Sequence, residues 1–179
     1  MDDHVFDAEQ ATELEGESRY RIISREALLG EIADGETVVD VGSGTGFFTD
    51  DIATRADTVY AVDFQEAMHE YYREKGVPEN VELVHSTAAD IDIPVADCIV
   101  SILSLHEIEL EAALERFRDL LNQGGKLLVV DWSANAETDD IPPREKLYTA
   151  ASASQQVRTY FDVREATERY DTFKLLARS

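Results

Sequence analysis

The chain of 179 residues has little basic charge, a single cysteine and no long apolar run. Lys and Arg together number 16 against 38 Asp and Glu, which gives a formal net charge of −22. Cys98 has no second cysteine to pair with and lies in an apolar stretch, where a buried and unreactive thiol is expected. Neither a transmembrane helix nor a secretory signal is visible, so we expect a cytoplasmic protein without membrane contact.

The acidic residues are spread along the whole chain and do not form a terminal tail. Dispersed acid on a folded domain is typical of a surface adapted to very high salt, where repulsion between like charges is screened. The composition therefore predicts a halophilic protein. Because no basic stripe is visible, nucleic acid is not expected as a partner.

A glycine-rich turn after an apolar run organises the rest of the sequence. The β-branched run Val38–Val41 predicts a parallel strand that is buried on both faces. It leads into Gly42, Gly44 and Gly46, and a helical pattern begins near Phe47. Glycine has no Cβ and permits positive φ, so a ligand can approach the turn and the free N–H groups at the helix start.

Two ligand classes fit such a turn. A dinucleotide site prefers G-x-G-x-x-G, whereas this loop reads G-x-G-x-G and has Phe47 where the last glycine would fall. With an aspartate two residues before the first glycine, the loop resembles motif I of the class I S-adenosylmethionine (SAM)-dependent methyltransferases. The resemblance implies a SAM site that includes Asp40, Gly42, Ser43, Gly44 and Gly46.

An acid follows each of the next two predicted strands. Asp63 ends the strand 58–62, and one carboxylate can accept hydrogen bonds from both hydroxyls of a ribose. Residues 60–64 resemble the second methyltransferase motif, which implies that Asp63 holds the ribose and Phe64 flanks the adenosine. After the strand 81–85, the resemblance implies that Asp90 meets the adenine amino group and Ile91 packs on the ring. Asp92 stays open as the alternative acid.

The acceptor side is expected where the strands 96–103 and 126–132 end, because ligands of open α/β sheets bind outside the carboxyl ends of strands. His106 and Glu107 are the candidate catalytic residues there, and Ser104 is a further candidate for cofactor binding. Asp131 and Trp132 are second candidates for the acceptor side. The histidines show no metal-binding spacing, so no metal is expected.

The order of the patterns predicts a doubly wound α/β fold in one domain, 1–179. The resemblance implies a mostly parallel seven-stranded sheet with an antiparallel last strand and helices on both faces. We expect a helical lead-in over 1–34, a cofactor-binding core over 35–132, and a lid segment with a C-terminal β-hairpin over 133–179. Within these parts the sequence predicts helices at 18–33, with Ser18 as the cap, and at 47–56, 65–75, 109–121 and 143–155. The hairpin strands are predicted near 157–163 and 170–178, and the lead-in residues Tyr20 and Arg25 are candidates for the rim of the site.

The resemblance implies transfer of a methyl group from SAM to an acceptor that the sequence does not identify. A small molecule is the favoured acceptor, because no inserted domain is visible and about thirty residues, 132–160, remain for a lid. A protein acceptor and a homodimer stay open. The alternatives are a non-catalytic SAM-binding or accessory module and an NAD(P)-dependent oxidoreductase, although the latter lacks a Tyr-Lys pair.

Overall fold

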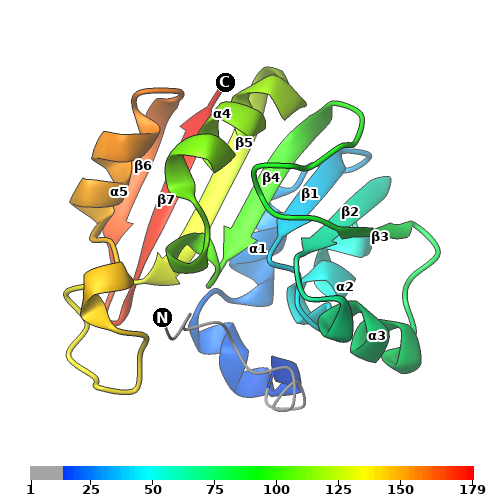
Figure 1. The fold of residues 1–179 in the computed structure, drawn as a ribbon, viewed down its shortest axis with the longest axis horizontal. Helices are drawn as coiled ribbons and strands as arrows, with labels where there is room; N and C mark the ends of the chain where they lie inside the picture. Colours follow the sequence, from blue (N-terminus) through cyan, green and yellow to red (C-terminus); the bar gives the residue numbers. More distant parts are fainter. Residues whose placement is uncertain (1–13) are drawn as a thin grey trace.

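The computed structural model describes residues 14–179, and anything predicted for residues 1–13 lies outside the described part. One seven-stranded sheet has the strand order β3-β2-β1-β4-β5-β7-β6 (Figure 1). Strands β1 to β5 pair in parallel, and β7 pairs antiparallel with both β5 and β6. The predicted mixed sheet with an antiparallel last strand is therefore confirmed.

The bounds of the elements between residues 37 and 132 follow the sequence patterns closely. The strands are β1 (Thr37–Val41), β2 (Thr58–Asp63), β3 (Val81–His85), β4 (Ala96–Ile102), β5 (Leu121–Trp132), β6 (Asp162–Glu168) and β7 (Thr172–Arg178). The α-helices are α1 (Arg25–Glu31), α2 (Phe47–Ala53), α3 (Glu66–Lys75), α4 (Leu110–Leu120) and α5 (Ala150–Val157). The short 3₁₀ helices are η2 (Glu17–Arg21), η3 (Leu105–Glu107) and η4 (Arg144–Lys146). Among residues 14–179 no helix is long and apolar enough to cross a bilayer.

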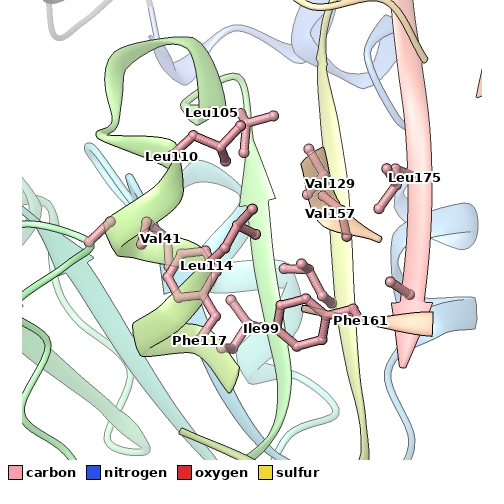
Figure 2. Packing of buried hydrophobic residues seen from close by; sticks show 14 of the residues in the cluster. Val41, Ile99, Leu105, Leu110, Leu114, Phe117, Val129, Val157, Phe161 and Leu175 are labelled. Carbon is pink, nitrogen blue, oxygen red and sulfur yellow. The ribbon is translucent and has the colours of Figure 1, made fainter. Parts of the chain in front are cut away.

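Helices cover both faces of the sheet, which explains why the central strands are almost uniformly apolar. Side chains of α1, α2 and α3 pack with Val38 of β1 in one buried cluster, and those of α4 and α5 pack with Val39 in another. Figure 2 shows the second cluster, in which Leu114 and Phe117 of α4 lie against the sheet. Strand β1 is thus covered on both faces, and its carboxyl end lies between those of β2 and β4.

The structure corrects the predicted start of two helices. The helix 18–33 is interrupted: residues 17–21 form η2, and α1 begins only after Ser24, whose hydroxyl accepts a hydrogen bond from the Ala27 N–H. Ser24 and not Ser18 is therefore the cap. The helix predicted at 143–155 begins at Ala150, because Thr149 and Ser152 form a capping box, and α5 extends into the region predicted as strand.

Gly46 is the point where the turn after β1 packs against α3. It has a φ of 85°, and a Cβ added there would lie 2.1 Å from the ring of Tyr72. Gly35 has a similar φ of 82°, but a Cβ there would meet nothing within 4 Å. Substituting Gly35 therefore causes only backbone strain, whereas substituting Gly46 causes the same strain together with steric overlap.

We predict that Gly46→Ala lowers the free energy of unfolding by about 1–3 kcal/mol more than Gly35→Ala, because overpacking adds to the strain. Denaturant unfolding of both variants and the parent chain measures the difference. Equal losses in the two variants would contradict the packing assigned to Gly46.

Candidate active site

A cavity of about 750 Å³ opens at the carboxyl ends of β1, β2, β4 and β5. Its lining comes from the glycine loop, the end of β2, the turn after β3, η3, the end of β5, the segment 14–22 and the loop 139–142. Clefts of 300–1,000 Å³ are typical of sites for small molecules and cofactors. The fold thus gathers in one place residues as far apart in the chain as Leu14 and Pro142.

The glycine loop forms one wall of this cavity. The N–H groups of Gly42 and Ser43 both donate to the Val62 carbonyl, at 2.8 and 3.0 Å, and thereby bind the loop to β2. Gly42 has a φ of 73°, and a Cβ there would lie 2.4 Å from the Cβ of Ser104. Gly42, Ser43 and Gly44 line the cavity. Only glycine at position 42 lets the loop lie this close to the turn after β4.

Asp63 joins the loop to the end of β2. Its Oδ2 accepts a hydrogen bond from the Gly44 N–H at 2.8 Å, and its Oδ1 accepts one from the Gln65 N–H at 2.9 Å. Burial raises the pKa of this carboxyl, and the two backbone hydrogen bonds oppose the rise. Each oxygen retains acceptor capacity, because an ionised carboxylate has about four lone-pair sites. Two adjacent hydroxyls, as in a ribose, are suitable donors.

Two further features of this wall suit an adenosine ligand. Phe64 is 45% exposed and lines the cavity, so its apolar ring is available for contact. The Ser43 hydroxyl is buried and has no hydrogen-bond partner among the described residues. A buried polar group of this kind usually has a partner, and a bound ligand would supply one. Met68 and Ala88 add apolar lining beside them.

The opposite end of the cavity holds a histidine–carboxylate pair. The Nδ1 of His106 lies 2.9 Å from Oδ1 of Asp131, and the His106 backbone N–H donates to Oδ2 at 3.0 Å. Burial lowers the pKa of His106, but the hydrogen bond and the negative charges of Asp131 and Glu107 outweigh it, so the pKa is raised overall. Both His106 and Glu107 line the cavity.

The chain reaches this pair through an unusual turn after β4. Leu103 has a φ of 58°, the only positive value of a non-glycine residue in the part of the chain that the structure describes. The next residue, Ser104, donates from its hydroxyl to the Val41 carbonyl at 2.7 Å and lines the floor of the cavity. Strained backbone of this kind is concentrated at functional sites, because surrounding contacts must hold it in place.

The segment before α1 covers the glycine loop, although not with the residues that the sequence indicated. Arg19 lies over the rings of Phe47 and Phe48, at 5.4 and 4.9 Å, and lines the cavity. Tyr20 and Arg25, the predicted rim residues, instead bind the two carboxylate oxygens of Asp51 and do not line it. Tyr20 lies in the 3₁₀ helix η2, where an α-helix was predicted, and Arg25 is in the first turn of α1, where Asp51 of α2 binds it.

The loop 139–142 closes the other side and depends on one arginine. The guanidinium of Arg144 donates to the carbonyls of Ala134, Ala136 and Thr138, at 3.0, 2.7 and 3.1 Å. These hydrogen bonds hold the backbone of residues 134–138, which leads into the loop. The predicted lid region thus supplies Asp139, Asp140, Ile141 and Pro142 to the cavity lining.

Comparison with known proteins agrees with this geometry. A family model for the methyltransferase domain matches residues 39–129, slightly more than half of the chain. This chain belongs to the class I SAM-dependent methyltransferases. The crystal structure of a SAM-dependent methyltransferase from Aquifex aeolicus is 28% identical, with a TM-score of 0.85 over 97% of this chain and 99% of that one. The family assignment replaces the alternative of an NAD(P)-dependent oxidoreductase.

Two other similar proteins have names that point to different substrates or partners. The ribosomal RNA small subunit methyltransferase A of Thermococcus sibiricus is 34% identical over 80 residues, which is 45% of this chain but only 29% of that protein. A chain from the complex between the Haloferax volcanii Trm112 methyltransferase activator and a methyltransferase shares the fold, with a TM-score of 0.81 and 14% identity over 95% of this chain and 93% of that one. The chain thus spans less than a third of the length of the Thermococcus protein.

The residues of this methyltransferase fit the cofactor of its family. The Asp63 carboxylate, the unpartnered Ser43 hydroxyl and the exposed Phe64 ring suit ribose hydroxyls, a polar group and an adenine face respectively. Gly42 lets the loop lie against Ser104, and a Cβ at Gly44 would be no closer than 3.6 Å to its nearest neighbour, Leu14. Of the residues named for the site from the sequence, the cavity brings together Gly42, Ser43, Gly44, Asp63, Phe64, Ser104, His106 and Glu107.

Four of the residues predicted to bind the cofactor do not line the cavity. Asp90 is exposed and accepts a hydrogen bond from the Thr87 hydroxyl at 2.7 Å, which closes its own turn. Ile91 is fully buried in the core cluster of α4 and α5, so its side chain cannot pack on a ligand in this structure. Ser86 and Ala88, which precede these two residues in the same turn, lie at the cavity instead. Gly46 contacts Tyr72, as described above.

Asp40 is the fourth of these residues and lies beneath the loop, 3% exposed. It accepts a hydrogen bond from the Thr49 hydroxyl at 2.6 Å. Burial raises its pKa from the usual 3.8 to about 6, although the Thr49 hydrogen bond and the charge of Arg19 oppose the rise. Asp40 therefore connects β1 to α2 and faces Arg19, and any effect on the ligand would act through these neighbours.

We predict that Asp40→Asn stabilises the fold increasingly as pH rises. Because the folded pKa exceeds the unfolded one, the carboxyl contributes stability while it is protonated, and this contribution is lost as pH rises through about 6. Asparagine stays neutral, so the variant should gain about 1–3 kcal/mol relative to the parent chain between about pH 4 and pH 8. Denaturant unfolding at both pH values measures the change, and a difference that is independent of pH would contradict a buried carboxyl with a raised pKa.

Proposed function

We propose that this protein transfers a methyl group from SAM to a small-molecule acceptor. The observation that carries the proposal is the single cavity that has the glycine loop and Asp63 at one end and His106 and Glu107 at the other. A transferase needs donor and acceptor in one enclosed space, because the methyl group passes directly between them. Family membership supports the donor, and the cavity volume of about 750 Å³ supports a small acceptor.

In this proposal the wall between β1 and β2 binds the cofactor. Asp63 accepts from the ribose hydroxyls, Phe64 covers the adenine, and the N–H groups and hydroxyl of the glycine loop face the rest of the molecule. SAM supplies a methyl group already activated by a positively charged sulfur. The chain's own residues then orient the two reactants and exclude water, and such positioning can contribute several kcal/mol to lowering the barrier.

The walls of the cavity favour a small acceptor over a macromolecule. The segment 14–22 and the loop 139–142 both contribute to the lining, and the Arg144 hydrogen bonds hold the backbone that leads into this loop. At low salt the net charge of −22 repels a phosphate backbone, and multimolar salt screens this repulsion. The first alternative is an RNA acceptor, because the name of the Thermococcus relative gives ribosomal RNA as its substrate. The second is assembly with a protein activator, because the Haloferax structure is a complex with one.

We predict that Asp63→Ala weakens binding of S-adenosylhomocysteine by about 1–3 kcal/mol, since ribose hydroxyls lose their acceptor. Asp90→Ala is the matched control, because Asp90 is exposed and does not line the cavity. Isothermal titration in multimolar KCl, where the surface charge is screened, measures both variants and the parent chain. An unchanged affinity of Asp63→Ala, or an equal loss in Asp90→Ala, would contradict the role assigned to Asp63.

The acceptor class is tested with SAM that carries a labelled methyl group. The enzyme is incubated separately with a small-molecule extract, total RNA and unfolded protein, with Asp63→Ala as the control for each. Label in the small-molecule fraction alone is the expected result. Label in RNA or protein would replace the proposed acceptor, and no label in any fraction, with intact binding of S-adenosylhomocysteine, would favour the non-catalytic SAM-binding module.

A further inference from the structure

The hydrogen bonds between η3 and β5 leave one nitrogen of a cavity-lining histidine able to accept a proton. We propose that Nε2 of His106 removes a proton from the acceptor, that Asp131 positions this histidine, and that the acceptor is accordingly an O–H or N–H compound whose reacting atom carries a proton. The inference rests on the proposed methyl transfer. It adds the chemical class of the acceptor and the role of two residues.

The geometry fixes which ring nitrogen is protonated. The Asp131 carboxylate accepts from the backbone N–H groups of His106 and Trp132, at 3.0 and 2.7 Å, and lies 2.9 Å from Nδ1 of His106. Because a carboxylate can only accept, Nδ1 carries the proton and Nε2 carries the lone pair. The side chains of His106 and Asp131 are 4% and 1% exposed, so packing restricts ring rotation.

The groups around the ring suit a base that becomes positively charged. Asp131 of β5 and Glu107 of η3 are negative, with Oε1 of Glu107 at 3.8 Å from Nε2, and both charges raise the pKa of His106. Lys146 of η4 acts in the opposite direction. Tyr148 also faces Asp131, and burial together with that negative charge raises the pKa of its phenol, which keeps it neutral. Neutral His106 is thereby a stronger base than a free imidazole.

These assignments say where each proton and electron pair goes during methyl transfer. The acceptor's O–H or N–H proton passes to Nε2, and the electron pair left on the acceptor atom forms the bond to the methyl carbon. The bond from carbon to sulfur breaks with its electrons on sulfur, which yields S-adenosylhomocysteine. The positive charge that disappears at sulfur reappears on the His106 ring, between two carboxylates. An acceptor without a proton at the reacting atom would have no use for this base.

The tautomer can be observed without any acceptor. Nitrogen-15 NMR of chain labelled at histidine follows the four imidazoles through a pH titration, and the spectrum of His106→Gln assigns His106. We expect a neutral ring protonated at Nδ1 and a pKa above the ordinary value of 6.5. A ring protonated at Nε2 would overturn the proposal. The tautomer and the pKa are read from the parent chain, and His106→Gln serves only to assign the signal.

The positioning role is tested with Asp131→Asn. A lower pKa of His106 and a mixture of both tautomers are expected, whereas Asp119→Asn, an exposed carboxylate on α4, should leave both unchanged. If Asp131→Asn folds and neither quantity changes, Asp131 does not position the ring. A merely structural role would alter stability but not the tautomer.

The acceptor class is tested with methyl-labelled SAM and the small-molecule extract. His106→Gln should bind S-adenosylhomocysteine like the parent chain, while its rate of label transfer falls about 10²–10⁴-fold. The parent rate should rise with pH through the pKa of His106 that NMR gives. A labelled sulfonium or quaternary ammonium product, or an unchanged rate in His106→Gln, would overturn this inference and leave the proposed methyl transfer intact. Loss of cofactor binding in the parent chain would instead count against the proposed function.

Discussion

The hydrogen bond from the Gly44 N–H to the Asp63 carboxylate joins the two halves of the wall proposed to bind SAM, and the rest of the site depends on it. It fixes the loop after β1 against the end of β2, and two further N–H groups of the loop bind the Val62 carbonyl. The loop can lie this close only because Gly42 has no Cβ that would overlap Ser104. Ser104 in turn begins the turn that carries His106 to the opposite wall. One local constraint thus links both ends of the cavity.

Buried acids surround this cavity, at some cost in stability. Asp40, Asp63 and Asp131 are all less than 9% exposed, and burial raises the pKa of the first two. Negative groups at such positions oppose compact folding but favour positively charged ligands and intermediates. In the proposed reaction a positive charge is present throughout, first on the cofactor sulfur and then on His106. The arrangement of acids therefore suits this chemistry better than it suits stability alone.

Much of this could be predicted from the sequence, because the predictable parts depend on local rules. The apolar run before Gly42, the acid at the end of β2 and the amphipathic pattern of α4 each encode their position within a few residues. The misplaced parts depend on tertiary contacts. Ile91 is directed into the core by the packing of α4, Asp90 closes its own turn, and the side chains of η2 face inward according to a 3₁₀ geometry that periodicity does not reveal. The pairing of His106 with Asp131 joins residues 25 positions apart, so the sequence offered the two as separate candidates only.

A crystal structure of the chain with S-adenosylhomocysteine tests the central claim most directly, because it locates both ends of the cavity relative to one ligand. The account predicts ribose hydroxyls on the Asp63 carboxylate, adenine against Phe64, and the sulfur directed toward the wall that carries His106. A sulfur that faces away from His106, or an adenosine bound outside the glycine loop, would contradict it.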